Sequence, residues 1–274
     1  MSAVANHPRR VDPETSAAHH SGIELRGDVE YEFGIPIAGR ILPPTEWTQT
    51  GIKRWPDTRP LDWVALFGHS APVVVDVGCG NGRFTLASAV QRPHYNHLAI
   101  DCLPVVIRYA TRRANQRGLK NVRFGVLGGW QFVRDFLPSH AIVELHCYHP
   151  QPYYRPQEYR RRLITPEFLS HVHRGLQAGG LFVLQTDNPA YAQYMRQIIP
   201  AFFVLHELDA PWPDAPAGRT RREILARRAG LPIFRFQAIP RPELTEEDYP
   251  RLIRDLPRPT FDAERGGQDL DRWG

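Results

Sequence analysis

The sequence contains little cysteine and no long apolar run. Its three cysteines, Cys79, Cys102 and Cys147, form no CxxC pair, and their odd number argues against a disulfide framework. We therefore expect small buried thiols in a reducing compartment and no zinc site built on cysteine. No apolar stretch approaches the roughly 20 residues of a membrane span, and the first residues contain no apolar signal region. These absences predict a cytoplasmic protein with neither a membrane nor a metal partner.

The sequence does contain an excess of positive charge and enough apolar residues for one core. Its 34 Lys and Arg residues outnumber 29 Asp and Glu residues, which gives a net charge of +5. A positive chain suits an anionic partner such as a nucleic acid, although charge alone does not prove one. With 274 residues, 42% of them hydrophobic, the chain is long enough for one sizeable α/β core with tails. Composition leaves the oligomeric state open.

Composition changes along the chain and divides it into three parts. We expect residues 1–39 to be a flexible N-terminal segment, because the first 28 or so mix Pro, His, Ser and charge without periodicity. Residues 40–240 form the folded domain, and residues 241–274 form a C-terminal extension with a short helix and a polar tail. The domain begins with an arm, residues 40–63, that is rich in proline and tryptophan. This arm either covers apolar surface or serves as a lid that faces the substrate.

From residue 72 onward, short β-branched runs alternate with helical stretches, which predicts a mostly parallel sheet. Two further strands are expected after the fifth, and the last of them enters antiparallel from a short helix. This pattern indicates a seven-stranded α/β fold of the Rossmann-like type, with helices on both faces. The strands are expected over residues 73–78, 97–101, 121–127, 141–148, 181–187, 202–209 and 232–239.

A glycine-rich turn between the first strand and the first helix is the most informative segment. Gly78, Gly80 and Gly82 allow close approach of a ligand to backbone N–H groups at a helix start, although such a turn fits NAD as well. Two acids favour S-adenosylmethionine (SAM). Asp76 precedes the first glycine, where it suits the amino-acid end of SAM, and Asp101 ends the next strand, where it can accept from both ribose hydroxyls. The alternative for Asp101 is a cap of the helix that follows.

A second motif follows the fourth strand, where two prolines fix an extended turn. In an open α/β sheet, the ligand crevice lies at the carboxyl ends of the strands where strand order reverses, here between the first and fourth strands. The turn and the basic residues behind it are Tyr148, His149, Pro150, Gln151, Pro152, Tyr153, Arg155, Arg160, Arg161 and Arg162.

With this motif the chain resembles the bacterial tRNA (guanine-N7) methyltransferase family. That family's pattern is two aromatic residues, Pro-Asp-Pro-Trp and a basic run into a helix, and the register holds from Tyr148 to Leu163. The resemblance continues at Thr186-Asp187 and at the Thr-x-x-Glu segment 220–223, and it covers about residues 73–240. It implies a class I SAM-dependent methyltransferase with tRNA as its partner, which transfers a methyl group to N7 of guanine 46.

The resemblance also implies roles for individual residues. It implies that SAM is contacted by Asp76 and Asp101. It also implies that the substrate is contacted by Arg155, Asp187, Thr220 and Glu223. Two of these assignments have simpler alternatives. Thr220 and Glu223 also form a capping box, and the basic run Arg160, Arg161 and Arg162 is either a phosphate contact or a solvated helix start. A further basic run, Arg108, Arg112, Arg113, Arg117 and Lys120, is expected to be an exposed helix face, with tRNA contact as the alternative.

The chain departs from the family's pattern at positions that bear on function. Gly128 stands where the family has an acid beside the adenine, and Trp130 is expected to stack on the adenine instead. Gln151, which we take as the catalytic position, replaces the motif's Asp, and Gln157 and Glu158 replace basic residues. Because guanine N7 has a free lone pair, methyl transfer needs placement and charge complementarity rather than a general base. Two alternatives remain: a SAM methyltransferase for another nucleobase or a small molecule, and a catalytically weak RNA- or SAM-binding protein.

Overall fold

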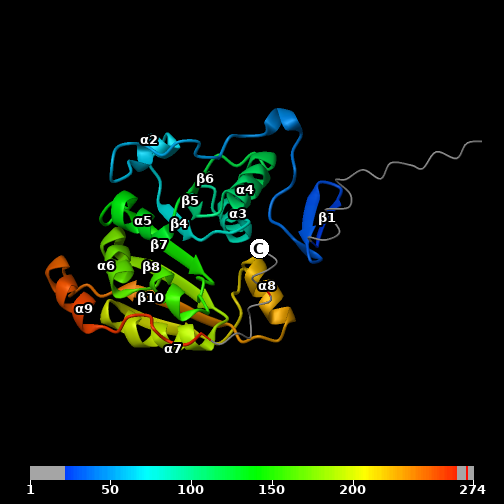
Figure 1. The fold of residues 1–274 in the computed structure, drawn as a ribbon. Helices are drawn as coiled ribbons and strands as arrows, with labels where there is room; N and C mark the ends of the chain where they lie inside the picture. The colour runs from blue at the N-terminus through cyan, green and yellow to red at the C-terminus, as the bar shows by residue number, and fades with distance from the viewer. Residues whose placement is uncertain (1–21, 264–269, 271–274) are drawn as a thin grey trace, which may run out of the picture.

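The computed structural model, which describes residues 22–263 and 270, contains a central seven-stranded sheet (Figure 1). The strand order is β6-β5-β4-β7-β8-β10-β9. The strands are β4 (Val73–Val77), β5 (Asn96–Asp101), β6 (Val122–Val126), β7 (Ile142–Tyr148), β8 (Leu176–Thr186), β9 (Phe203–Leu208) and β10 (Phe234–Pro240). All seven strands expected from the sequence are confirmed, with β8 beginning earlier than expected.

The direction of the strands agrees with the expected fold. β4 pairs in parallel with β5 on one side and β7 on the other, and β7 pairs in parallel with β8. β10 runs antiparallel to both β8 and β9. All five residues of β4, four valines and Asp76, are buried, as expected for a central parallel strand. The Rossmann-like class predicted from the sequence is therefore confirmed.

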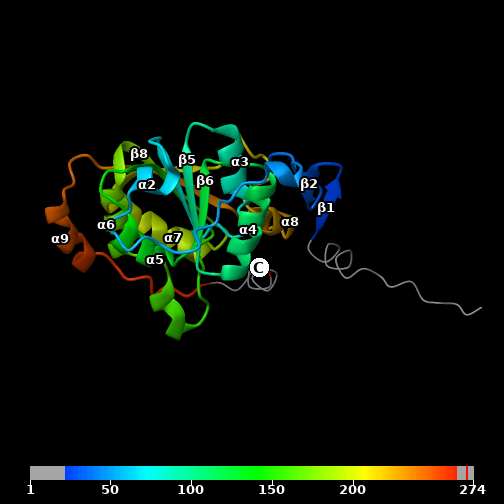
Figure 2. The same cartoon turned by 90° about the horizontal axis from the view of Figure 1, so that it is seen from above.

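Helices cover both faces of this sheet (Figure 2). One apolar cluster joins α3 and α4 to β5 and β6, and another joins α6 and α7 to the opposite side of the strands. The α-helices are α2 (Trp63–Phe67), α3 (Arg83–Gln91), α4 (Pro104–Gln116), α5 (Gly129–Gln131), α6 (Pro166–Gly175), α7 (Pro189–Ile198), α8 (Arg221–Arg228) and α9 (Tyr249–Asp255). Within residues 22–263, no helix combines the length and the apolar character that crossing a membrane requires.

Local sequence explains where α6 and α7 begin. The Thr165 side chain accepts a hydrogen bond from the backbone N–H of Phe168, and the Asn188 side chain accepts one from the N–H of Tyr191. Each cap is followed at once by proline, whose fixed φ and missing N–H suit the first helical position. These caps fix the starts of the two helices that cover one face of the sheet.

The proline-rich arm lies along the free edge of β6. The backbone N–H of Ile52 donates to the Phe124 carbonyl at 2.7 Å, and the N–H of Phe124 donates to the Thr50 carbonyl at 2.9 Å. Trp55 then donates from its indole N–H to the Val126 carbonyl at 2.9 Å. The expected irregular arm across the domain is thus confirmed, and its contacts cover backbone groups that would otherwise form an open sheet edge.

The N-terminal part corrects one expectation. We expected residues 1–39 to be flexible, but residues 23–36 form a three-stranded antiparallel sheet: β1 (Ile23–Arg26), β2 (Val29–Glu32) and β3 (Ile35–Pro36). Residues 1–21, on which the rest of that expectation falls, lie outside the described residues. The sheet is held because Glu30 and Glu32 are buried against arginines of the domain. Local composition does not reveal this long-range pairing.

The C-terminal extension begins as expected with a helical segment. The 3-10 turn η5 (Glu246–Asp248) leads into α9. The chain then returns to the domain, where the Tyr194 hydroxyl donates to the Pro257 carbonyl at 2.9 Å and Ala263 is buried. Residues 257–263 are therefore packed against α7 rather than forming the polar tail that we expected; residues 264–269 and 271–274 lie outside the described part.

Candidate functional site

The two sequence motifs meet at one edge of the sheet. β4 and β7 are parallel neighbours, so their carboxyl ends lie side by side, and strand order reverses between them. The glycine-rich loop follows β4, and the Pro-Gln-Pro turn follows β7. The fold therefore brings both motifs to the place where strand order reverses, as the sequence predicted.

The three glycines of the loop have different roles. All have positive φ: 76° at Gly78, 52° at Gly80 and 78° at Gly82. A Cβ atom added to Gly78 or Gly80 meets no heavy atom within 4 Å, so these positions border open space. A Cβ on Gly82 would lie 2.8 Å from the Cβ of Ala110, so this glycine lets α3 pack closely against α4. The first two glycines fit a ligand that approaches the backbone.

Asp76 has one buried carboxylate oxygen that accepts no hydrogen bond from any described residue. Its Oδ2 accepts from the Thr85 hydroxyl at 2.6 Å, while its Oδ1 has no hydrogen-bond partner in the described part of the chain. Burial raises the pKa of Asp76 to about 7, partly opposed by the Thr85 hydrogen bond. Because an unpaired buried acceptor costs free energy, a donor group on a ligand would stabilise this position.

Asp101 fixes the shape of the same loop. Its Oδ2 accepts from the backbone N–H of Gly80 at 3.1 Å, and its Oδ1 accepts from the N–H of Leu103 at 2.9 Å. The second contact lies one residue before α4, whose N-cap is Leu103, and no side-chain cap hydrogen bond is found there among the described residues, so the alternative role as a helix cap is not observed. Each carboxylate oxygen has a second lone pair, so contact with ribose hydroxyls stays a prediction.

Apolar side chains are exposed beside Asp101. Leu103 is 52% exposed, Val105 59% and Val126 40%, and Cys102 is exposed as well. Exposed apolar groups at strand ends suit the flat face of an adenine.

Our expectation of three buried thiols is wrong for Cys102, which is exposed; Cys147 is buried and Cys79 half-buried.

Gly128 and Trp130 lie beyond the end of β6. Gly128 precedes α5, and a Cβ there would meet no atom within 4 Å. The Trp130 ring packs edge-on against His171 of α6, with 5.4 Å between centroids, and the side chain stays 39% exposed. Stacking of Trp130 on an adenine stays a prediction.

The turn after β7 is held by a chain of polar side chains. The indole N–H of Trp212 donates to Gln185 Oε1 at 2.5 Å, so the amide nitrogen of Gln185 donates to His149 Nε2 at 2.7 Å. The ring proton of His149 then lies on Nδ1 and is donated to Asp187 Oδ1 at 2.9 Å. Arg222 of α8 binds the other oxygen of Asp187 at 2.8 Å.

Both carboxylate oxygens of Asp187 are therefore occupied by side chains of the same molecule. Its burial would raise its pKa, but the hydrogen bond from His149 and the charge of Arg222 outweigh burial and hold that pKa below its usual value. Both carboxylate oxygens are engaged, and the residue is 9% exposed. Asp187 positions the turn, and its predicted contact with substrate stays a prediction.

Thr220 caps α8, which is half of the capping box expected as the simpler interpretation; the Glu223 side chain accepts from the N–H of Arg219 rather than from that of Thr220. The Thr220 hydroxyl accepts from the Glu223 backbone N–H at 3.1 Å. The Glu223 carboxylate is fully buried; it accepts from the Arg219 backbone N–H at 2.8 Å and pairs with Arg235 at 2.7 Å. Their role toward substrate stays a prediction.

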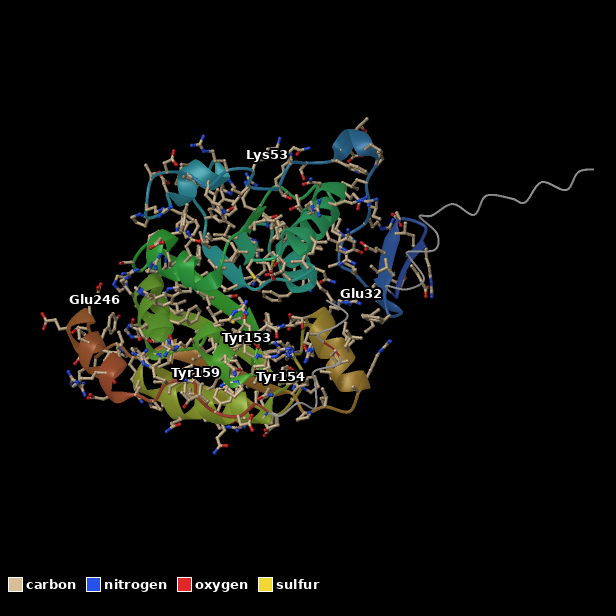
Figure 3. The ribbon with its side chains drawn as sticks, in the orientation of Figure 1. Glu32, Lys53, Tyr153, Tyr154, Tyr159 and Glu246 are labelled. Atoms are coloured by element: carbon tan, nitrogen blue, oxygen red, sulfur yellow. The ribbon has the colours of Figure 1, made fainter. Side chains whose placement is uncertain are left out.

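Gln151 and three of the basic residues behind it are exposed. The exposed positions are Gln151, Arg155, Arg160 and Arg161, which leaves them accessible to a large substrate. Tyrosines of the same segment are interleaved with them (Figure 3). Tyr153 belongs to the motif that the sequence indicated, whereas Tyr154 and Tyr159 were not singled out. Aromatic and basic residues in alternation are the signal that could have marked this segment as a candidate nucleic-acid surface.

Arg162 corrects the expectation for the basic run. Arg162 is buried, so it is neither a solvated residue nor accessible to an RNA phosphate. Its guanidinium donates to the carbonyls of Pro152 (2.5 Å), Tyr153 (2.8 Å), Pro259 (2.7 Å) and Phe261 (2.7 Å). Arg162 therefore ties the Pro-Gln-Pro turn to the C-terminal extension.

The basic run on α4 is also divided differently from our expectation. Arg108, Arg112 and Lys120 are exposed, but Arg113 and Arg117 are buried. Their guanidinium groups bind Glu30 at 2.8 and 2.9 Å. The alternation Val29-Glu30-Tyr31-Glu32 is the strand signal that could have found the partner.

Comparisons with known proteins agree with this fold. The strand order and the glycine loop define a Rossmann-like protein of the class I methyltransferase type. A family model described as "Putative methyltransferase" matches residues 70–236, and the chain belongs to that family. Among solved structures, the 16S rRNA methyltransferase KamB shares the fold, with a TM-score of 0.53, 18% identity and coverage of 70% of this chain and 99% of that one.

Several curated relatives have the same name, tRNA (guanine-N(7)-)-methyltransferase. The protein from Arthrobacter sp. (strain FB24) is 31% identical over 57% of this chain and 50% of its own length. The one from Pasteurella multocida (strain Pm70) is 28% identical over 56% of this chain and 59% of its own. The one from Alcanivorax borkumensis is 26% identical over 82% of this chain and 91% of its own. The first two matches span only half to three fifths of the length of those relatives. The shared name and the matched family model confirm the family resemblance that the motifs indicated.

Proposed function

We propose that this chain transfers a methyl group from SAM to N7 of a guanine in tRNA. The named relatives support the reaction, and the uninterrupted register from Tyr148 to Leu163 supports the substrate class. The position in tRNA that the family resemblance implies is 46. The three cysteines are free thiols, and Cys102 is exposed, which supports the reducing cytoplasm as the compartment of the protein.

The observation that carries the proposal is the unsatisfied Oδ1 of buried Asp76 at the base of an open glycine loop. The ammonium of the amino-acid end of SAM would satisfy this oxygen, and the ribose would reach Asp101. Gly78 and Gly80 have the open space that close approach of a ligand requires. SAM, when bound, supplies a methyl group made electrophilic by its sulfonium.

On the substrate side, the chain has to place guanine N7 and leave its lone pair free. The Gln151 amide can accept from guanine N1–H and donate to O6, which recognises guanine and rejects adenine. The neighbouring turn is held rigid through His149 and Arg162, so the side chain at 151 has a defined origin. Arg155, Arg160 and Arg161 are exposed and suit the RNA backbone.

The proposal is tested by incubating the protein with unmodified tRNA and SAM and analysing the nucleosides by mass spectrometry. The expected product is 7-methylguanosine, which should also be lost from tRNA of a strain that lacks the gene. A different methylated nucleoside would show that the enzyme methylates another base and would refute the guanine-N7 proposal. SAM binding without any methylated product would make the chain a binding protein.

A further inference from the structure

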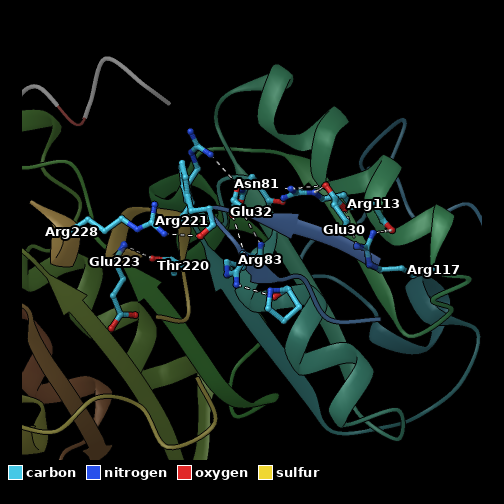
Figure 4. A network of polar contacts seen from close by, with 12 residues as sticks. Glu30, Glu32, Asn81, Arg83, Arg113, Arg117, Thr220, Arg221, Glu223 and Arg228 are labelled. Carbon is cyan, nitrogen blue, oxygen red and sulfur yellow. Dashed lines mark hydrogen bonds and ion pairs between the residues drawn. The ribbon is translucent and has the colours of Figure 1, made fainter. Parts of the chain in front are cut away.

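Glu32, at the end of β2, joins three separate parts of the molecule (Figure 4). Its side chain is fully buried. The Asn81 amide donates to its Oε1 at 2.8 Å, and the Arg221 guanidinium binds the same oxygen at 3.0 Å. Arg83, at the start of α3, lies 3.4 Å from Oε2. One carboxylate from the N-terminal sheet therefore contacts the glycine loop, the helix after it and α8.

The contact with Asn81 concerns the loop assigned to the methyl donor. Asn81 stands between Gly80 and Gly82, and both glycines have positive φ. Its carbonyl also accepts from Arg113 at 3.3 Å, and its Oδ1 accepts from the backbone N–H of Arg83 at 3.3 Å. Since glycine gives a loop more freedom to lose on binding, side-chain anchors at Asn81 lower the cost of ordering it.

The contact with Arg221 leads to the other half of the site. Arg222, the next residue on α8, binds Asp187, which in turn accepts from His149 of the substrate turn. α8 is held to the N-terminal sheet a second time by Arg228, which donates to the Phe33 carbonyl at 2.6 Å. A continuous set of charged contacts thus runs from the donor loop through Glu32 and α8 to the turn that contains Gln151.

We propose that Glu32 is a positioning residue that orders the methyl-donor loop through Asn81 and couples it to the substrate turn through Arg221. The inference rests on the proposed function. It makes the N-terminal sheet a working part of the site, although the matched family model begins only at residue 70.

The same strand offers a matched control in Glu30. Glu30 is also buried and binds two arginines, Arg113 and Arg117, at 2.8 and 2.9 Å. Unlike Glu32, it has no contact with Asn81 or α8 among the interactions of the described residues. A purely structural role would make the two glutamates equivalent, whereas a positioning role makes them differ in ligand binding.

The test measures the Kd of S-adenosylhomocysteine by calorimetry, and the melting temperature without ligand, for full-length variants. We expect Glu32→Gln to raise this Kd about tenfold, or 1.4 kcal/mol, and Glu30→Gln to raise it less than about twofold while both lower the melting temperature. Asn81→Ala should also weaken binding. Adding Glu32→Gln to it should have little further effect, because both changes act on the same hydrogen bond between Asn81 and Glu32. Equal Kd values for wild type and Glu32→Gln, equal losses in both glutamate variants, or fully additive losses would overturn the proposal.

A second variant covers the case in which Glu32→Gln does not fold. Glu32→Asp keeps the negative charge among the arginines but withdraws the carboxylate from Asn81 by one methylene, and should raise the Kd about threefold with a near-normal melting temperature. Coupling is tested by adding tRNA, which should tighten S-adenosylhomocysteine binding to wild type and do so less in Arg221→Gln. An Arg221→Gln variant with unchanged coupling would remove α8 from the inference. A wild type that binds no S-adenosylhomocysteine would instead refute the proposed function.

Discussion

The amide of Gln185 donates to Nε2 of His149 at 2.7 Å and thereby directs the other ring nitrogen toward Asp187. His149 has a φ of 51°, a left-handed conformation that is costly for a residue with a side chain. The backbone N–H of His149 also donates to the Gln185 carbonyl at 2.6 Å. β8 thus holds a strained residue at the start of the turn that presents Gln151.

Gln185→Leu should loosen this turn. It leaves His149 Nε2 and the Trp212 indole N–H without partners in a buried environment, which should cost about 1 to 3 kcal/mol of stability. We expect a lower urea midpoint and a kcat reduced about tenfold, because this turn presents Gln151, the position that we propose as catalytic. Gln177→Leu, an exposed change on the same strand, is the control, and equal behaviour of the two variants would contradict the assignment.

Donor binding should depend on pH through Asp76. Its pKa of about 7 means that the carboxylate gains a proton as the pH falls below 7, and the protonated form attracts an ammonium poorly. We expect the Kd of S-adenosylhomocysteine to rise up to tenfold per pH unit below 7 and to be constant in Asp76→Asn, measured by calorimetry from pH 5.5 to 8. A flat wild-type curve would show that the ligand does not use this oxygen.

The same group has an opposite effect on the stability of the ligand-free protein. Its pKa is raised on folding from the ordinary 3.8 to about 7, so the folded state binds more protons in that window. Stability is therefore lost as the pH rises from about 4 to 7. At pH 8 the free energy of unfolding of Asp76→Asn should exceed that of wild type by on the order of 2 kcal/mol, so the variant should melt at a higher temperature. A lower melting temperature for the variant would contradict the burial argument.

Arg162→Lys should separate the substrate turn from the C-terminal extension. A lysine has three donors on a flexible stem and cannot reproduce a planar fork that reaches four carbonyls. We expect a loss of about 2 to 3 kcal/mol in urea unfolding and a raised KM for tRNA. Arg161→Lys, on the exposed neighbour, should leave the stability within about 0.5 kcal/mol.

Salt dependence should distinguish the exposed arginines from a merely solvated surface. Replacing Arg155, Arg160 and Arg161 by Ala should weaken tRNA binding and flatten the log-log salt slope by about 0.9 per residue on a duplex, or 0.7 on a single strand. The measurement is tRNA affinity at several salt concentrations. Arg254→Ala, an exposed change on α9, serves as control; a slope unmoved in the triple variant would make those arginines ordinary surface residues.

Gln151→Asp should raise the rate of methyl transfer to guanine N7. Methylation makes the ring cationic in the transition state, and an anion stabilises that charge more than a neutral amide does. We expect about a tenfold increase in kcat, or 1.4 kcal/mol, with little change in donor affinity, measured by single-turnover methylation of tRNA. A variant that stays inert on a full tRNA pool, like its parent, would argue against the guanine-N7 reaction.

Local sequence was sufficient for the sheet and for the place of the candidate site. Four of the five residues of Val73–Val77 are valines, which favours a buried strand. Asp76 is the fourth residue of this strand and Gly78 follows it directly, so both lie at its carboxyl end. The caps at Thr165 and Asn188 act over three residues and are therefore also local signals, although we did not single them out in the sequence.

The tertiary structure decided which charged residues are buried. Arg113, Arg117 and Arg162 stand in basic runs that locally resemble exposed helix faces, and each is buried because of a partner far along the chain: Glu30 is 83 residues from Arg113 and 87 from Arg117, and Phe261 is 99 from Arg162. A guanidinium is stable away from water only where carboxylates or carbonyls replace its hydration. Whether such partners arrive depends on how distant segments pack, and no local pattern of residues contains that information.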